Sequence, residues 1–517
     1  MKKINKLLTY CIVGGALALT GSGCEKFKDF GNTNVNPNGS SEVLTSALIT
    51  NIESYLGNPI GIGAATTANP GGAPNLAVSA LNPGHYCQYF AEPTYPGNQI
   101  YNLPQFNSAG TYSSILMDCQ VVINKNYNDA TKGLPTVLSG GSNRNQIAVA
   151  KILQAFIYWK LTDAWGDLPY TEALKGTANL TPKYDAQETI YKGILDSLTS
   201  TLSTTSGFDD SGIPVKGDIV FAGSNAKWKK VANSLRMLIA LRMSKRYPGA
   251  SEYAATQFKA AAEHPAGHIT ANADNFTLAY AGGNYRNPWF SAGASEDNGV
   301  AKTFTDVLTG LSDTRISALA TTANGIPYGD KTARPNTCKI LNASFRTETA
   351  PLVIINAASI WLAKAEAIER AWITGDSKAA YDAGVTASFE QWGAAIPAAY
   401  LTTGPSNFNT GAGVAAVNTN TLTPGGNATT SSKMARIALQ QWIAFYPDGL
   451  QGWSNWRRQG VPDIRPTVFV SPSSNGQIIR RYVYGTTEYA LNNANLQTAL
   501  PNIPGGDKQE SRVWWDR

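Results

Sequence analysis

The sequence is poor in the side chains that most enzymes use for catalysis. It has three histidines in 517 residues, His85, His264 and His268, and neither a G-x-S-x-G nucleophile motif nor a P-loop. His264 and His268 have the spacing of metal ligands on a helix, but Pro265 and Gly267 between them disfavour a helix. We therefore expect no enzymatic activity, no metal site and no cofactor.

Charged residues are also scarce. They make up 15% of the chain, against roughly 25% in an average soluble protein. The net charge is +6, and three lysines within the first six residues account for half of it. The sequence has no block of lysine and arginine and no basic helix face, so it lacks the electrostatic footprint of a nucleic-acid-binding protein. A polar but weakly charged surface is common in exported proteins that meet neutral ligands.

Long apolar runs and paired cysteines are missing beyond the first 24 residues. No stretch there approaches the ~18 consecutive apolar residues of a membrane-spanning helix. Cys87, Cys119 and Cys338 are odd in number and widely spaced, a pattern of neither a zinc site nor a disulfide framework. We expect three buried free thiols.

The first 24 residues resemble a lipoprotein leader. Residues 1–6 are basic, residues 7–20 are apolar, and residues 21–23 are small and stand directly before Cys24. A lipoprotein signal peptidase requires that cysteine, because its thiol is acylated and becomes the new N-terminus. We expect a signal peptide over 1–23, lipid attachment at Cys24 and a flexible tether over 24–41. The alternative is simple secretion with an incidental cysteine.

Apolar residues recur with helical spacing along much of the remaining chain. Predicted helices cover about 41–56, 112–128, 146–162, 186–202, 228–242, 251–263, 300–310, 431–446 and 450–457. The stretch 359–392 predicts a helical hairpin that is about one tetratricopeptide repeat long. Loop-rich stretches lie near 57–111, 264–350 and 400–432, and the chain after 480 is mostly irregular. These patterns predict a mainly α fold of tetratricopeptide-like helix pairs, with long irregular loops and little β, as a single domain over 42–517.

A corner is predicted at residues 158–170, where an apolar helix stops. Gly166 can take the left-handed conformation of a helix terminator, and Pro169 cannot continue a helix. Asp163 and Asp167 flank this stop and could be imagined as the acid/base pair of a glycosidase. Structural capping is sufficient to explain both carboxylates. We predict that Asp163 and Asp167 bind backbone N–H groups.

Two loops combine aromatic residues with polar neighbours, as sugar-binding sites do. Aromatic rings pack on the apolar faces of sugars while amide, carboxylate and guanidinium groups hold the hydroxyls, although packing in the core is the alternative for each ring. The candidate ligand-binding residues are Tyr285, Arg286, Asn287 and Trp289, followed by Tyr95 and Tyr101.

Four arginines stand beside aromatic residues near the C-terminus. Arg457–Arg458 and Arg480–Arg481 neighbour Trp453, Trp456 and Tyr482. They could grip an acidic partner, or they could stack on tryptophan and pair with local acids. We favour the second interpretation.

Several motifs occur together in a characteristic order. They are the leader, Asn-Pro-Asn at 36–38, the stretch 162–173, Pro-Lys-Tyr-Asp at 182–185, Lys-Trp at 227–228, Asn-Ser-Leu-Arg at 233–236, Arg-Met-Ser at 242–244, Gln-Trp-Ile-Ala at 441–444, Trp-Arg-Arg at 456–458, Gly-Val-Pro at 460–462, and Arg-Arg-Tyr at 480–482 with Glu488 and Asn492. Together they resemble the SusD/RagB family of outer-membrane nutrient-binding lipoproteins, in particular its SusD-like branch. Gly485 departs from the pattern, which has a proline after the tyrosine.

The resemblance implies a function as well as a mostly helical fold. It implies a lipid-anchored protein facing outward on the outer membrane, which binds a glycan and acts as the lid of a SusC-like TonB-dependent transporter. A peptide-binding lid is the alternative, and a surface glycosidase or a purely structural partner of the transporter is less favoured. The family motifs concern fold and docking, so no ligand-binding residue is carried over from them.

Overall fold

The computed structural model describes residues 43–57, 81–102, 108–332, 337–411 and 432–517. Leu44–Arg517 forms one compact unit. Cys24, the leader, the tether and most of the 400–432 segment lie outside the described residues. Helices dominate the described chain, and its strands form three antiparallel pairs only. The predicted mainly α class is confirmed.

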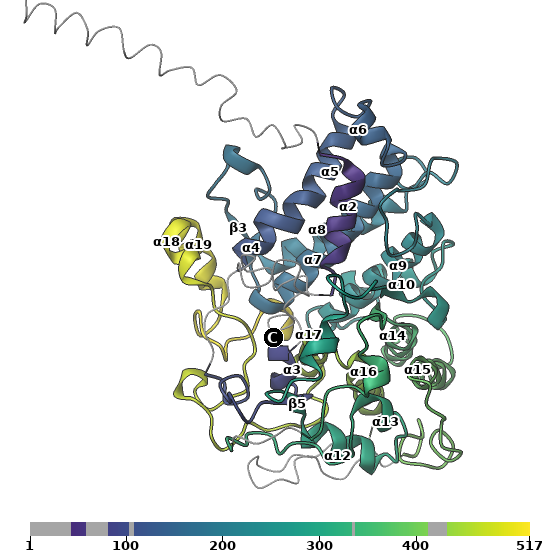
Figure 1. Cartoon of the computed structure of the whole chain (residues 1–517), viewed down its shortest axis with the longest axis vertical. Coiled ribbons are helices and arrows are strands. Elements are labelled where there is room, and N and C mark those ends of the chain that lie inside the picture. The colour runs from purple at the N-terminus through teal and green to yellow at the C-terminus, as the bar shows by residue number, and fades with distance from the viewer. Residues whose placement is uncertain (1–42, 58–80, 103–107, 333–336, 412–431) are drawn as a thin grey trace, which may run out of the picture. The chain divides into compact units, whose positions relative to one another are not determined.

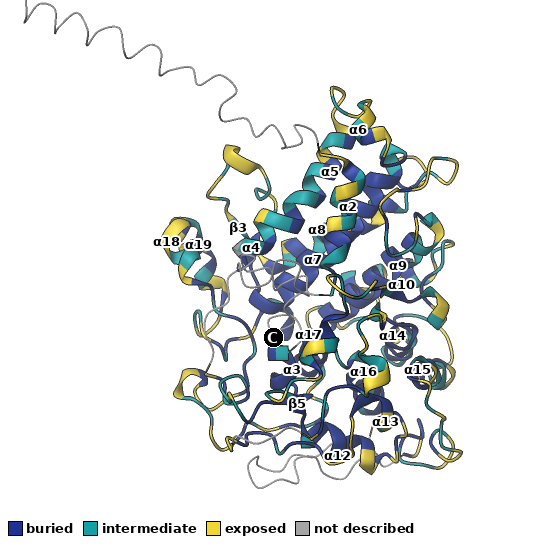
Figure 2. Ribbon diagram, viewed as in Figure 1, coloured by how far each residue is buried: buried dark blue, intermediate teal, exposed yellow. Residues whose placement is uncertain are grey.

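The first half of the unit is a series of helices that pack on their neighbours in sequence (Figure 1). They are α2 (Thr45–Ser54), α5 (Met117–Tyr127), α7 (Asn143–Trp165), α8 (Gln187–Thr201), α9 (Asn225–Arg242) and α10 (Tyr253–Ala262). Helix α7 is buried along most of its length, as the dark blue ribbon in Figure 2 shows. Its apolar faces predict this central position, because a helix that is apolar nearly all round must be covered on several sides.

The second half is built on a helical hairpin, α14 (Ala357–Glu369) and α15 (Ser377–Gln391). Asp376 begins α15 by accepting hydrogen bonds from the backbone N–H groups of Lys378 and Ala379 at 2.8 and 3.1 Å. Gly384 lets the helices approach closely, since a Cβ atom there would lie 2.8 Å from Cγ of Leu362. Helix α16 (Lys433–Phe445) packs on α14, and α17 (Gly449–Gln459) packs on α16 and on α3 (Asn82–Tyr86).

Short strands and helices occur between the main helices, some of them in the described parts of the predicted loop regions. The strand pairs are β1 (Phe90–Ala91) with β5 (Gly299–Val300), β2 (Leu168–Pro169) with β3 (Tyr184–Asp185), and β4 (Phe276–Leu278) with β6 (Leu352–Ile355). The short helices are α4 (Ala109–Thr111), α6 (Pro135–Leu138), α11 (Pro288–Ala292), α12 (Lys302–Gly310), α13 (Ile316–Leu319), α18 (Thr486–Leu491) and α19 (Asn493–Ala499). Helices α18 and α19 lie in the tail that the sequence predicts as irregular, because such short helices carry too little apolar periodicity to be recognised.

The corner after α7 forms as predicted, and Asp167 holds backbone there. Helix α7 ends at Trp165, and Gly166 follows with a φ of +92°. One carboxylate oxygen of Asp167 accepts from the backbone N–H of Gln187 at 2.8 Å, at the start of α8. The other oxygen accepts from the side chain of Asn502 at 3.0 Å. The prediction for Asp167 is confirmed.

The prediction for Asp163 is wrong in its partner. Its carboxylate accepts from the hydroxyl of Tyr191 on α8, and its Oδ2 lies 3.2 Å from Nε of Arg242 on α9. No backbone N–H of the following turn reaches it. Asp163 lies in the last turn of α7, and a helical side chain leans back over the preceding turn, so the carboxylate faces the neighbouring helices.

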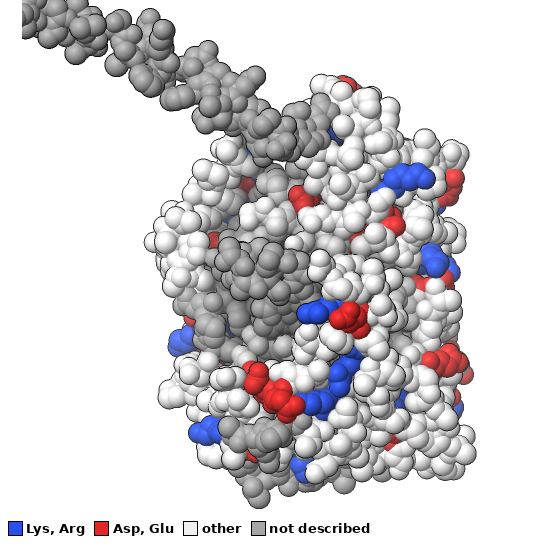
Figure 3. All heavy atoms as spheres, in the orientation of Figure 1, with Lys and Arg blue, Asp and Glu red and all other residues white. Residues whose placement is uncertain are grey.

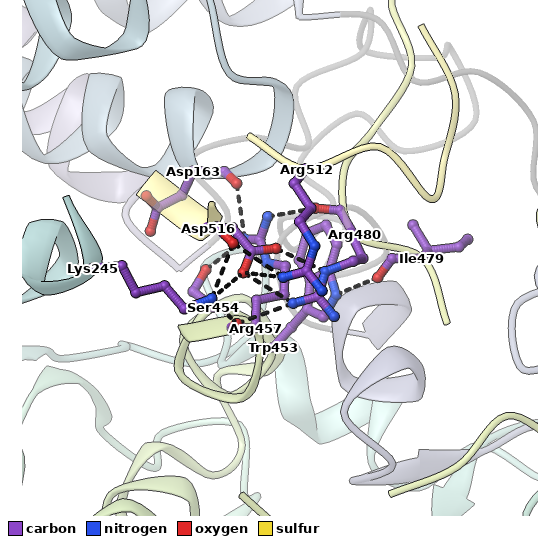
Figure 4. A network of polar contacts seen from close by, with 9 residues as sticks. All are labelled: Asp163, Lys245, Trp453, Ser454, Arg457, Ile479, Arg480, Arg512 and Asp516. Atoms are coloured by element: carbon purple, nitrogen blue, oxygen red, sulfur yellow. Dashed lines mark hydrogen bonds and ion pairs between the residues drawn. The ribbon is translucent and has the colours of Figure 1, made fainter. Parts of the chain in front are cut away.

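The four arginines near the C-terminus stack on aromatic rings or pair with acids, as the sequence favours, and Figure 4 shows Arg457 and Arg480 among their partners. The guanidinium carbon of Arg457 lies 3.6 Å from the ring centre of Trp453 and 4.7 Å from that of Trp515. Arg480 pairs with the buried carboxylate of Asp516, 2.7 Å away, which Lys245 and Arg512 also contact. Arg481 pairs with Asp507, and Arg458 with Glu366. Arg457 donates to the carbonyl of Arg480, and Arg481 donates to the carbonyl of Trp165, so these arginines join the C-terminal residues to α17 and to the corner.

Surface charge and thiols also follow the sequence. Figure 3 shows Lys, Arg, Asp and Glu side chains scattered among uncharged areas on the visible face. Cys87, Cys119 and Cys338 are buried thiols outside any disulfide, as predicted. Residues 264–268 lie outside any helix, so His264 and His268 do not present two nitrogens on one helical face. In the described part of the chain, no cluster of three or more His, Cys, Asp or Glu side chains could hold a metal ion.

Candidate functional site

A cavity of about 500 Å³ lies where the two halves of the unit meet. Its wall comes from the middle of α7, the residues after α2, the start of α11, the loop and strand over 341–356, the end of α15, and the turn between α16 and α17. Strand β6 is held in this wall by its pairing with β4. A volume of this size lies in the range of small-molecule sites, which occur preferentially where structural units meet.

Aromatic side chains line much of this space, which we call the aromatic cavity. They are Phe156, Trp159, Trp289, Phe345, Trp392, Phe445 and Tyr446. Phe345 and Phe445 are half-buried, whereas Trp159 and Trp289 are almost completely buried. Rings in a cavity offer flat apolar surfaces, and flat apolar surfaces suit the C–H faces of sugars as well as other apolar ligands.

A charged pair forms the polar part of the wall. Nζ of Lys160 on α7 lies 2.5 Å from Oδ2 of Asp448. Lys160 is buried at 4% exposure, whereas the Asp448 side chain is 27% exposed. The other carboxylate oxygen of Asp448 begins α17 by accepting from the backbone N–H of Gln451 at 3.1 Å. The helix start therefore fixes the position of the carboxylate.

Two amide side chains of the wall are already engaged through both their oxygen and their nitrogen. Asn287 accepts from the backbone N–H of Trp289 at 2.7 Å and donates to the carbonyl of Ala350 at 2.8 Å. Asn356 likewise caps α14 and donates to the carbonyl of Ala444 at 2.9 Å. These two amides shape the wall and have little capacity left for a ligand.

Other polar atoms of lining residues have no partner among the described residues. They are Nε1 of Trp159, Nε2 of Gln451 and Oε1 of Gln391. Gln451 is oriented by Arg242, which donates to its Oε1 at 2.7 Å. Buried donors and acceptors normally have partners, so these three atoms are unsatisfied polar groups next to the cavity.

The structure brings two of the six candidate ligand-binding residues to the cavity. Asn287 and Trp289 lie in its wall, and the Trp289 ring also packs on Phe90 with ring centres 5.7 Å apart. Tyr285 lies outside the wall, and its ring packs on that of Tyr280 with ring centres 4.9 Å apart. Arg286 is half-buried, and its Nη1 lies 3.6 Å from Oε1 of Glu348.

The remaining two candidates lie away from the cavity on the loop after β1. Tyr101 is fully buried, and its hydroxyl lies 3.4 Å from that of Tyr328. Tyr95 is exposed at 67% and presents its ring to solvent. The backbone of Tyr101 has a φ of +64°.

Sequence reasoning missed most of the cavity wall. Phe156, Trp159 and Lys160 lie on α7, which the sequence predicts as a core helix. One signal was available, since Lys160 is a lysine in an otherwise apolar buried helix, and such a residue requires a buried partner. The partner, Asp448, is 288 residues away in sequence, so the pairing was not visible.

No helix among the described residues is long and apolar enough to cross a membrane.

Comparison with known proteins identifies the fold. A family model described as "starch-binding associating with outer membrane" matches residues 37–485. A comparison with curated protein sequences gave no match. A SusD homolog from Bacteroides uniformis is 23% identical, with a TM-score of 0.72 over 92% of this chain and 100% of its own. A chitin-binding SusD homolog from Flavobacterium johnsoniae is 22% identical, with a TM-score of 0.72 over 91% and 99%. A SusD homolog from Parabacteroides distasonis is 20% identical, with a TM-score of 0.72 over 92% and 98%. The chain belongs to the SusD-like family.

Proposed function

We propose that this protein is a lipid-anchored, outward-facing receptor of the outer membrane that binds an oligosaccharide in the aromatic cavity. It then delivers the glycan to a partner TonB-dependent transporter, which it covers as a lid. The observation that carries the proposal is a small-molecule-sized cavity, lined by seven aromatic residues, in a SusD-like fold. The starch-binding description of the family and the chitin-binding relative support a glycan as the ligand.

Binding without catalysis agrees with the chemistry of the wall. Most glycoside hydrolases use two carboxyl groups on either side of the scissile bond. Among the described lining residues, Asp448 is the one carboxylate, and it is paired with Lys160. Asp163 and Asp167 lie outside the wall and are engaged elsewhere in the fold.

Isothermal titration calorimetry and affinity electrophoresis against a panel of polysaccharides and oligosaccharides test the proposal. We expect binding to at least one glycan without release of new reducing ends. Binding of peptides together with silence across the glycan panel would instead support a peptide-binding lid. Release of reducing ends would support a glycosidase.

Phe345→Ala and Phe445→Ala are expected to weaken glycan binding about tenfold each, or about 1.4 kcal/mol. Both rings line the cavity and are half-buried, so each has surface to offer a ligand; the Phe345 ring also packs edge-on against Trp392 of the wall, with ring centres 5.4 Å apart. Calorimetry gives the affinity, and thermal melting checks the fold. Phe290→Ala is the matched control, because Phe290 is a half-buried phenylalanine outside the wall. Equal affinities for the three variants would contradict the assignment of the cavity.

We propose different roles for the six candidate ligand-binding residues. Trp289 contacts the ligand from the cavity wall, and Asn287 positions it by capping α11. Tyr95, with its exposed ring, offers an outer contact for a longer chain. Tyr285 and Arg286 lie next to α11, and Tyr101 supports the loop that carries Tyr95.

Cys24→Ala is expected to release the protein from the membrane. Without the thiol there is no acylation site, and no described helix could anchor the chain in its place. Fractionation of cells with immunodetection measures the distribution between membrane and soluble fractions. Persistent membrane attachment of the variant would contradict a lipid anchor at Cys24. Co-purification of a stable complex with a TonB-dependent transporter tests the role as a lid.

A further inference from the structure

We infer that the Lys160–Asp448 pair makes the aromatic cavity selective for the uncharged end of an oligosaccharide, with the pair binding sugar hydroxyl groups. The inference rests on the proposed glycan-binding function and adds to it the net charge of the ligand. It also names the two residues that determine this class.

The first observation is the charge of the wall. Of the described residues that line the cavity, Lys160 and Asp448 are the charged ones, and they face each other across 2.5 Å. The wall is therefore electrically neutral. An acidic sugar would bring a second negative charge towards Asp448, and an amino sugar would bring a second positive charge towards Lys160. An uncompensated charge in a partly desolvated site is unfavourable, so both are disfavoured relative to a neutral sugar.

The second observation is the mixture of donors and acceptors at this end of the cavity. The Lys160 ammonium group has three N–H donors and the Asp448 carboxylate only accepts. Trp159 precedes Lys160 on α7, and Gln451 follows Asp448 on α17; each carries a buried N–H donor that has no partner among the described residues. A hydroxyl group both donates and accepts, so adjacent sugar hydroxyls can bond to the carboxylate and to the donors together.

The third observation is size. A cavity of about 500 Å³ is at the lower half of the range for small-molecule sites, enough for roughly two or three sugar rings. Its walls come from both halves of the unit and from strand β6, so the ligand is surrounded on several sides. This arrangement favours a short oligosaccharide or the end of a chain.

Trisaccharides of equal length and different charge test the inference on the full mature protein. Maltotriose and N,N′,N″-triacetylchitotriose are neutral, the fully deacetylated chitosan trisaccharide is cationic, and trigalacturonate is anionic. We expect calorimetry to show binding of at least one neutral trisaccharide and at least tenfold weaker binding of both charged ones. Equal or tighter binding of trigalacturonate or of the chitosan trisaccharide would overturn the inference.

Removing the charge of Asp448 or of Lys160 should change the relative affinities for anionic, cationic and neutral trisaccharides. Asp448→Asn keeps the oxygen that begins α17 and leaves Lys160 unpaired, so the preference should move towards trigalacturonate by about tenfold relative to the neutral trisaccharide. Lys160→Gln should move it towards the chitosan trisaccharide. A merely structural role would weaken all ligands alike without changing their order. Asp129→Asn is the control, because Asp129 pairs with Lys132 on the exposed surface.

The outcomes separate this inference from the proposed function. If neutral glycans bind but Asp448→Asn leaves the order of charged and neutral ligands unchanged, the inference is wrong and glycan binding stands. If no glycan binds, or if only peptides bind, both are wrong. Should Lys160→Gln fail to fold because its site is buried, Asp448→Asn and the wild-type panel remain decisive, since the Asp448 side chain is 27% exposed.

Discussion

Arg457→Met is expected to lower the free energy of unfolding by about 2–4 kcal/mol, because the variant leaves two backbone carbonyls without the donor that Arg457 supplies. It is 1% exposed and lies between the rings of Trp453 and Trp515. It donates to the carbonyls of Asp163 and Arg480, each at 2.8 Å, and thereby joins α17 to the corner after α7 and to the C-terminal segment. Methionine can fill the space but leaves both carbonyls without this donor.

Urea unfolding followed by tryptophan fluorescence measures the loss. Arg465→Met is the matched control, because Arg465 pairs with Asp463 on the surface, where both side chains are about half exposed. We expect the control to change stability by no more than about 0.5 kcal/mol. A similar small change for Arg457→Met would show that the cluster in Figure 4 contributes little to the fold.

Arg458→Met is expected to lower the free energy of unfolding by a similar amount, about 3–5 kcal/mol at pH 7, by leaving Glu366 with too few partners. Glu366 is fully buried on α14, and both its oxygens accept from Arg458, at 2.5 and 2.7 Å. Burial alone would raise the pKa of Glu366, but Arg458 and then Arg370 outweigh it and lower the pKa to about 2. In the variant, the buried carboxylate retains Arg370 and Gln441.

This destabilisation should depend on pH. The folded-state pKa of Glu366 is below its ordinary value of 4.5, so the pair stabilises the protein above that pH and loses its effect as the pH falls towards 2. The difference in stability between wild type and Arg458→Met should therefore be largest near pH 7 and shrink near pH 3. Urea unfolding at the two pH values measures it. Arg370→Met, which removes one 2.9 Å contact at a partly exposed side chain, should have a smaller effect. A pH-independent loss would point to packing instead of charge.

For both arginines the sequence predicts stacking on aromatic rings and pairing with acids, but it does not identify the partner residues. The tryptophan next to Arg457 and the tyrosine close to Arg480 in sequence indicate stacking, and an internal arginine requires an acid. Which acid it is cannot be deduced locally, since Glu366 stands 92 residues before Arg458. Asp163 shows the same limit. Its position in the last helical turn is visible in the sequence, whereas Tyr191 and Arg242 become its neighbours only when α8 and α9 pack on α7.

The candidate site divides in the same way. Attention to aromatic loops led to Trp289 and Asn287, which line the cavity. It did not lead to Phe156, Trp159 and Lys160, because their helical periodicity is that of a core helix, and a cavity wall has the same apolar pattern as a packed core. Whether an apolar face meets a neighbour or an empty space depends on how the elements pack.

The sequence by itself determined the helical class, the approximate positions of the main helices, the glycine stop after α7, the buried thiols and the family. These depend on local periodicity, backbone freedom and composition, which act over a few residues. The tertiary structure alone decided the cavity, the pairing of Lys160 with Asp448 and the partners of Asp163. Those contacts join residues far apart in the chain, and nothing in the spacing of either partner specifies the other. The anchor at Cys24 is expected from the leader, while the neutral and aromatic character of the cavity comes from helices that meet only in the folded chain.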